Sequence, residues 1–379
     1  MPETPEKRPY IGGQAVLEGV MMRAPRSFAV VVRRRDGSLL VRERPITEER
    51  RGLGKVPFFR GVASLVESLR LGSEALRFSA DQMEKDLVAE ERAQKKAKAG
   101  GALNVLRALA MTVFALVTAA DGEPVQAAVG EPKKTKGAMG FMLVVAVLFL
   151  IALPQVAAAG LNKGLHLGLE IQSPMFQVVT GAFKLAIVIG YLVLIRRVAD
   201  IRRVFQYHGA EHKTITTYEA EEELVVANAR TKTTLHPRCG TTFLVMVALV
   251  SILVFTAIGS FLPRIQTGHA VLDNVIFFLE KLPFLPAIAG VTFELQRVFA
   301  RYCTTGPLRA LLWPGFLVQK ITTIEPSDDQ LEVALASLRA TLFRETGGDD
   351  PGLTEAGTGD VAFASYAEIA KAPRLRTAA

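Results

Sequence analysis

Three long apolar stretches with at most one charged residue each constrain the fold of this 379-residue chain more than any other feature. Residues 137–162 and 239–263 contain no charged side chain, and residues 171–195 contain only Lys184. Each stretch exceeds the roughly 20 residues that an α-helix needs to cross the hydrocarbon core of a bilayer. The sequence therefore predicts a mainly α fold, that of a polytopic α-helical membrane protein with three spans whose partner is the lipid bilayer.

A fourth apolar segment, residues 271–293, is interrupted by charges and prolines. The interrupting residues are Asp273, Glu280, Lys281, Pro283 and Pro286. Such residues are tolerated at membrane depth where the backbone faces protein or water, so the pattern predicts a kinked or re-entrant fourth segment. Residues 102–120 are apolar but short and contain Arg107, and we expect them to lie at the interface or against protein.

Lysines and arginines beside the apolar segments explain much of the formal net charge of +8. They include Lys133, Lys134, Lys136, Arg196, Arg197, Arg202 and Arg203. Because basic residues flank membrane helices on the cytoplasmic side, the pattern places residues 196–240 and both termini in the cytoplasm. No nucleic-acid partner is expected from charges placed in this way. The polar residues 1–10 lack the apolar core of a cleavable signal peptide.

The segments before and after the apolar stretches have patterns of their own. Asp36-Gly37 lies between two β-rich runs and predicts a small N-terminal β-hairpin, because Asp-Gly favours a tight turn between antiparallel strands. Ser327 is a candidate N-cap before an amphipathic helix. The expected organisation is a β-rich segment 1–60, an amphipathic helix and linker 61–136, a membrane domain 137–313, a C-terminal helix 314–346 and a disordered tail 347–379.

Residues that could carry chemistry concentrate between His208 and Cys239, a stretch with three of the five histidines and one of the two cysteines. We expect the helix of residues 171–195 to continue into this region. On a helix, His208 and His212 lie on one face, one turn apart, where two imidazoles can bind one metal ion. Glu211 completes a His-x-x-Glu-His pattern, in which a glutamate beside two metal-binding histidines acts as a general base on water.

Cys239 directly precedes the third predicted span, after a turn that contains His236 and Pro237. A helix N-terminus and the neighbouring Arg238 would lower the pKa of its thiol and favour the thiolate that binds metals. Imidazole and thiolate ligands together favour zinc among the divalent metals.

The candidate metal ligands in this stretch are His208, His212, His236, Cys239 and Glu219. Together with Glu211 they allow four interpretations. An open site keeps a position for water and supports hydrolysis, with Glu211 as the base. A closed site of three histidines and Cys239 would be structural, in a membrane scaffold or assembly factor. Without metal, Cys239 and His236 could form a nucleophile pair, or the histidines could be ordinary hydrogen-bonded residues. We take a membrane-embedded, metal-dependent hydrolase as the leading hypothesis, acting on peptide or lipid-linked substrates in an oligomeric state that the sequence does not define.

Glycines at two places suggest close contacts of the backbone. Gly209 weakens its predicted helix by up to about 1 kcal/mol relative to alanine, which points to a backbone or ligand that approaches it. Gly12-Gly13 permits unusual backbone angles at the start of a run in which Glu18 lies among apolar neighbours. Glu18 is expected to pair with an arginine.

The chain resembles the YqhQ-like family of bacterial membrane proteins, a domain family of unknown function (DUF1385). The motifs that carry the resemblance are GGQAVLEGVMMR at 12–23, VPFFRG at 56–61, YHGAEHK at 207–213, HPRCGTTFL at 236–244 and PGFLVQKITTIEP at 314–326. The resemblance implies a bacterial inner-membrane protein of a kind labelled as a metal-dependent enzyme, and it implies no substrate.

Overall fold

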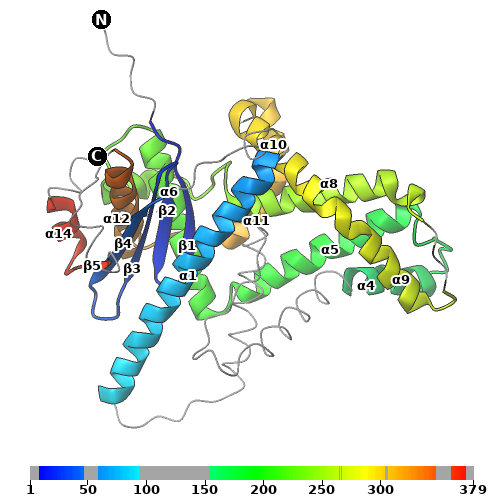
Figure 1. Ribbon diagram of the computed structural model, residues 1–379, viewed down its shortest axis with the longest axis horizontal. Helices are drawn as coiled ribbons and strands as arrows, with labels where there is room; N and C mark the ends of the chain where they lie inside the picture. Colours follow the sequence, from blue (N-terminus) through cyan, green and yellow to red (C-terminus); the bar gives the residue numbers. More distant parts are fainter. Residues whose placement is uncertain are drawn as a thin grey trace, which may run out of the picture.

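The computed structural model describes residues 8–46, 59–93, 153–263, 265, 267–303, 306–346 and 360–372. Two regions are visible in Figure 1, one built around a β-sheet and one formed by long helices that extend away from it. The predictions for residues 102–120 and 121–136, and most of the first predicted span, lie outside the described residues.

The sheet region contains five antiparallel strands in the order β1-β2-β3-β4-β5. They are β1 (Gly12–Val16), β2 (Gly19–Arg23), β3 (Ser27–Arg33), β4 (Leu39–Pro45) and β5 (Asp360–Phe363). The central strand β3 reads SFAVVVR, a nearly continuous apolar run, because helices cover both faces of the sheet.

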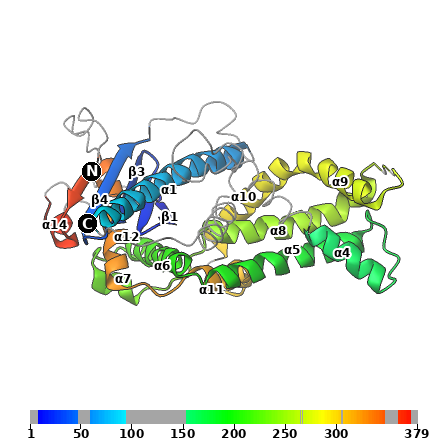
Figure 2. The ribbon, with the colours of Figure 1, turned by 90° about the horizontal axis from the view of Figure 1, so that it is seen from below.

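Helices lie on both sides of the sheet in Figure 2, and alternating side chains of β3 belong to two different cores. Phe28, Val30 and Val32 pack in one core with Leu71 and Phe78 of α1 (Phe59–Ala93). Ala29 and Val31 belong to the opposite core, which includes apolar residues of α6 (Ala199–Glu219) and α12 (Asp328–Glu345). The sheet region thus buries α6, the helix that carries two of the candidate ligands, in a rigid core.

The sequence predicted part of this region correctly. The hairpin around Asp36-Gly37 is confirmed as β3 and β4, with Gly37 at a φ of 88° in the turn. Ser327 precedes α12 as expected, and its backbone N–H donates to the Gln330 side chain (2.9 Å). The prediction of a disordered tail is wrong for residues 360–372, because β5 pairs with β4 and α14 (Tyr366–Lys371) follows it.

The second region consists of apolar helices with short 3-10 turns between some of them. They are α4 (Leu153–Gly164), α5 (Pro174–Ile195), α8 (Gly240–Ile258), η3 (Gly259–Phe261), α9 (Ala270–Lys281), η4 (Leu282–Phe284) and α10 (Leu285–Tyr302). Among the described residues, three helical segments are long and apolar enough to cross a membrane: Pro174–Ile195, Gly240–Ile258 and Val275–Tyr302.

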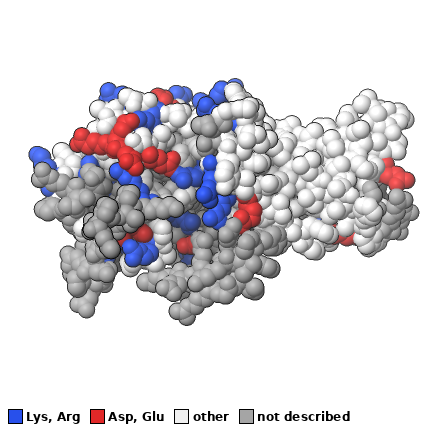
Figure 3. All heavy atoms as spheres, turned by 90° about the horizontal axis from the view of Figure 1, so that it is seen from above, with Lys and Arg blue, Asp and Glu red and all other residues white. Residues whose placement is uncertain are grey.

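The surface of this region agrees with that assignment. Large apolar side chains are exposed on several of its helices, among them Leu194 (64%), Leu253 (69%) and Leu279 (52%). In Figure 3 the charged side chains gather over the sheet region, and the visible surface of the helical region is almost free of them. Such a surface suggests association with a membrane, because in water this large apolar area would be exposed to solvent.

The predicted spans meet the structure in different ways. The helices at 171–195 and 239–263 are confirmed, and the interrupted fourth segment contains the 3-10 turn at Pro283 before it continues to Tyr302. The helix of the second span does not continue into the histidines, because the backbone leaves the helix at Arg196–Val198 and α6 starts anew at Ala199.

Three short elements connect the two regions. They are α7 (Val226–Thr231), η5 (Pro307–Leu312) and α11 (Trp313–Thr322). After α11 the chain passes directly over α6, and the Ile324 N–H donates to the Phe205 carbonyl (3.0 Å). A Cβ atom at Gly209 would lie 2.2 Å from the Ile324 carbonyl oxygen, which explains the glycine expected to mark a close backbone approach.

Gly209→Ala should therefore destabilise the protein although alanine favours a helix. The added methyl meets backbone, which cannot move aside cheaply, and such overpacking typically costs about 1–3 kcal/mol against a propensity gain of about 1 kcal/mol. Gly190→Ala is the matched control, since no described atom lies within 4 Å of a Cβ there. Thermal unfolding in detergent should show a lower Tm for Gly209→Ala than for Gly190→Ala. Equal Tm values would contradict the packing of residue 324 on α6.

Candidate metal centre

Helix α6 presents both histidines of the His-x-x-Glu-His pattern toward the same point. The predicted one-turn spacing is confirmed, and the ring centroids of His208 and His212 lie 4.4 Å apart. Buried apolar residues of the same helix, such as Val204 and Phe205, pack in the core of the sheet region. The site-facing side chains of α6 are therefore fixed by the packing of the sheet region.

Cys239 approaches the histidines from a different element. It is the N-cap of α8, where the Thr241 N–H donates to its Sγ atom (3.4 Å). The loop before it is held by Gln319, whose side chain accepts from the His236 N–H (2.8 Å) and donates to the His236 carbonyl (2.7 Å). Gln296 adds a hydrogen bond to the Cys239 carbonyl (3.1 Å).

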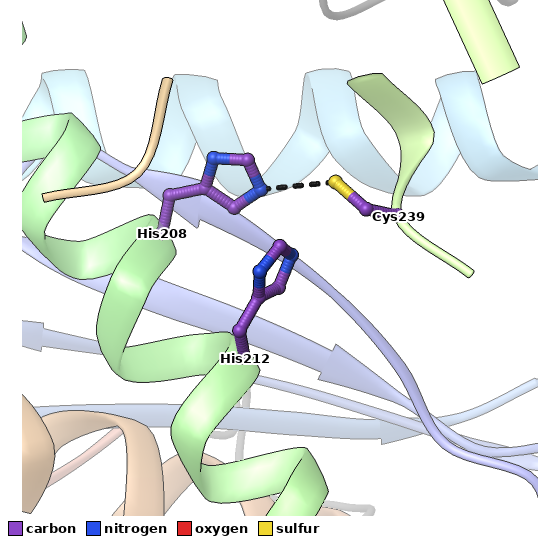
Figure 4. A group of neighbouring side chains, drawn as sticks. All are labelled: His208, His212 and Cys239. Carbon is purple, nitrogen blue, oxygen red and sulfur yellow. Dashed lines mark hydrogen bonds between the residues drawn. The ribbon is translucent and has the colours of Figure 1, made fainter. Parts of the chain in front are cut away.

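The three side chains converge as Figure 4 shows. His208 Nε2 lies 3.2 Å from Cys239 Sγ, and one ligand atom each from His208, His212 and Cys239 lie within 4.8 Å of one another. His208 and His212 are both oriented through Nδ1, which contacts the carbonyls of Thr322 (2.9 Å) and Thr234. When Nδ1 donates to a carbonyl, Nε2 carries the lone pair, the arrangement found in metal-binding histidines.

One buried nitrogen in this cluster has no hydrogen-bond partner among the described residues. It is His212 Nε2, on a side chain that is only 1% exposed. An unsatisfied buried polar atom is costly, so its position beside a thiol and a second imidazole needs an explanation. A divalent cation fits this donor set, and three protein ligands would leave a position for water, as in catalytic zinc sites.

Glu211 lies on the same helix and is buried (5% exposed). Burial raises the pKa of its carboxyl to about 7, although the imidazoles of His212 and His208 oppose this shift. Its carboxylate rests on β1, since a Cβ atom at Gly13 would lie 2.7 Å from Glu211 Oε1. A carboxyl with a pKa near neutrality is suited to accept and return a proton.

The charges of His208 and Cys239 support each other. Burial acts against the pKa shift of both groups, yet the thiolate raises the pKa of His208 to about 9 and the imidazoles lower the pKa of Cys239 well below its usual range. The expected contribution of Arg238 is wrong, because Arg238 pairs with Glu219 and lies over the Tyr10 ring. The thiolate is therefore favoured by histidines rather than by arginine.

His236 and Glu219 lie next to this cluster and are not part of it. His236 Nε2 faces Glu219 Oε2 (3.2 Å), and its ring centroid is 5.7 Å from that of His212. Burial lowers the pKa of His236 to about 4. The structure thus does not support His236 or Glu219 as ligands, because the two side chains bind each other instead. The structure also does not support the predicted pair of Cys239 and His236, because the imidazole in contact with Cys239 Sγ is that of His208.

The sequence does not indicate that several other residues belong to the site. The carbonyls of Thr322 and Thr234 orient the histidines, and backbone groups have no signature in a side-chain pattern. The sequence indicates backbone freedom at Gly13, but its contact with Glu211 depends on how β1 packs on α6. The expected partner of Glu18 is Arg203, which donates to both carboxylate oxygens.

The fold and the cluster define a mainly helical protein with an N-terminal antiparallel sheet and three helices that are apolar enough to cross a membrane. Residues 56–344 match the family described as "Protein of unknown function (DUF1385)", and the chain belongs to this family. A curated relative is the "Uncharacterized protein YqhQ" of Bacillus subtilis (strain 168), 28% identical over 345 residues that cover 89% of this chain and 93% of that protein. No solved structure is significantly similar to the chain.

Proposed function

We propose that this protein is a metal-dependent hydrolase of the bacterial inner membrane, with its site on the cytoplasmic side. The observation that carries the proposal is the convergence of His208, His212 and Cys239 around a buried imidazole nitrogen without a described partner. Zinc is favoured, because imidazole and thiolate suit it. Metal sites with three protein ligands and a buried carboxylate nearby are typical of hydrolysis.

The protein's own residues would divide the work as follows. His208 and His212 would hold the ion through Nε2, each oriented by its Nδ1 contact to a backbone carbonyl, and Cys239 would be the third ligand. When bound, such an ion supplies a Lewis acid that makes water acidic near neutral pH. Glu211 accepts a proton from water at its carboxylate and returns it to the leaving group, a role that a pKa of about 7 favours.

A second candidate is a metal-free cysteine nucleophile, which the 3.2 Å contact between His208 Nε2 and Cys239 Sγ favours. It would leave His212 Nε2 unexplained, and it gives Glu211 no role in proton transfer. A structural site in a membrane scaffold is the remaining alternative, in which Glu211 would be dispensable. The Glu211→Gln variant tests the proposed hydrolase against the metal-free nucleophile and against the structural site. Its cellular function and its metal content should be measured on the same protein.

The proposed orientation makes a separate prediction for the labelling of introduced cysteines in spheroplasts. Ala220→Cys, beyond α6, should react with a membrane-impermeant maleimide only after permeabilisation. His166→Cys, in the loop between α4 and α5, should react in intact spheroplasts. Both positions are exposed, and the native Cys239 and Cys303 are buried. The reverse labelling pattern would place the site on the outer side of the membrane and contradict the proposed orientation.

A further inference from the structure

Strand β1 forms one edge of the sheet, and it lies next to the metal centre. Among the described residues it pairs with β2 on one side and with no strand on the other. β1 is also the strand nearest the apolar helices in Figure 1. Helices α6 and α1 lie against its two faces, so the free edge runs between them.

The hydrogen-bonding register shows which backbone groups of β1 point outward. Ala24 N–H donates to the Ser27 carbonyl (2.9 Å) at the β2–β3 turn, and hydrogen-bonded pairs alternate from there along an antiparallel ladder. Met22 and Val20 therefore bond to β3. The other residues of β2 are Gly19, Met21 and Arg23, and they bond to Val16, Gln14 and Gly12.

The N–H and C=O groups of Gly13 and Ala15 consequently point away from the sheet. Neither residue has a hydrogen bond to any part of the chain that the structure describes. Ala15 is nevertheless only 8% exposed. Buried backbone groups are almost always paired, so an outward row of donors and acceptors at this depth is a site for another strand.

This edge lies directly against the candidate general base. The carboxylate of Glu211 occupies the space where a side chain of residue 13 would be, with Oε1 2.7 Å from that Cβ position. Neighbouring strands lie about 4.8 Å apart, so a segment paired with Gly13 would pass within one side chain of Glu211. In Figure 4 strands of the sheet cross the view behind the rings of His208 and His212.

From this arrangement we infer that the free edge of β1 binds an extended polypeptide as an added strand, and that this polypeptide is the substrate of the site. The inference rests on the proposed hydrolase and names its substrate class. Strand addition obtains affinity from main-chain hydrogen bonds and therefore selects polypeptides over lipid-linked substrates, which offer no such row of amides.

The reaction is then hydrolysis of a peptide bond. The oxygen of water bonds to the scissile carbonyl carbon, and Glu211 accepts the proton that water loses. The C–N bond breaks with its electron pair on nitrogen, and Glu211 returns the proton to the leaving amine. One water is consumed for each carboxylate and amine formed, and no oxidant or reductant is needed.

Hydrogen–deuterium exchange resolved to single amides tests the binding step without catalysis. The full-length Glu211→Gln protein in detergent would be measured alone and with reduced, carboxymethylated α-lactalbumin, a permanently unfolded polypeptide. Alone, the amides of Gly13 and Ala15 should exchange at least about 10-fold faster than that of Gln14, which bonds to β2. With the polypeptide, both should slow by at least about 10-fold, while β5, at the opposite edge of the sheet, should not change.

Two results would overturn the inference. Unchanged exchange at Gly13 and Ala15 in the presence of saturating polypeptide would show that the edge does not bind it. Exchange as slow as that of Gln14 in the protein alone would show that the chain itself already covers the edge. Neither result depends on metal or on turnover. The proposed hydrolase is tested separately, by the function of Glu211→Gln and by metal content.

Ala15→Pro provides a second, independent readout. Proline removes the outward N–H of residue 15 and leaves the β2-facing groups of Gln14 and Val16 in place, as edge strands tolerate. Binding of the fluorescein-labelled polypeptide should weaken by at least about 10-fold, with metal content unchanged. Equal binding by Ala15→Pro would contradict strand addition, and the exchange rates of β3 would show whether the variant is folded.

Discussion

Glu211→Gln should lower the cellular function of the protein by about 100-fold or more while its metal content stays the same. Glutamine keeps the shape of the buried side chain against Gly13 but cannot accept a proton from water. General acid–base catalysis typically contributes 10²–10⁴-fold, which sets the expected loss. The measurement is complementation of a deletion strain that has a growth phenotype, with metal determined on the same purified variant.

Glu223→Gln is the matched control, because Glu223 is exposed in the acidic loop after α6 and lies outside the cluster. It should complement fully. Full complementation by Glu211→Gln, with metal retained, would instead favour a structural site in a scaffold. Loss of both metal and function would mean that Glu211 holds the site together rather than transferring a proton.

The second large effect is expected for the histidine whose Nε2 has no described partner. His212→Ala removes one of three converging ligand atoms and should weaken metal binding by more than the 10–100-fold typical of changes to residues that orient a ligand. His236→Ala is the matched control, since the His236 side chain is also buried and its ring centroid lies 5.7 Å from that of His212, but it faces Glu219. It should keep the metal. Metal loss in His236→Ala with retention in His212→Ala would refute the ligand set.

Much of the architecture could be predicted because it depends on local patterns. The apolar runs at 171–195, with Lys184 as its single charge, and at 239–263, with none, predict their helices directly, and Asp36-Gly37 predicts the β3–β4 turn. His208 and His212 share a face of α6 simply because four residues make about one helical turn. These properties need no knowledge of distant contacts.

The rest depends on contacts between distant parts of the chain. The β1–β2 hairpin turns through Leu17-Glu18, with Glu18 at a φ of 52° and no glycine at either of these two positions. β5 is a four-residue strand that becomes recognisable only when β4 offers it an edge.

The ligand set depends on long-range contacts in the same way. Gln319 binds the backbone of His236, and the His236 side chain turns to Glu219. Cys239, three residues later, is thereby left as the partner of His208. No spacing rule distinguishes these two neighbours, since both follow α6 at similar distances along the chain.

The most direct test of a metal centre at His208, His212 and Cys239 is the metal content of the full-length protein, purified in detergent without exposure to chelators. We expect about one equivalent of a divalent metal, with zinc favoured by the ligands. Less than about a tenth of an equivalent in folded protein would contradict this expectation and would leave the Cys239–His208 pair as the better explanation of the cluster.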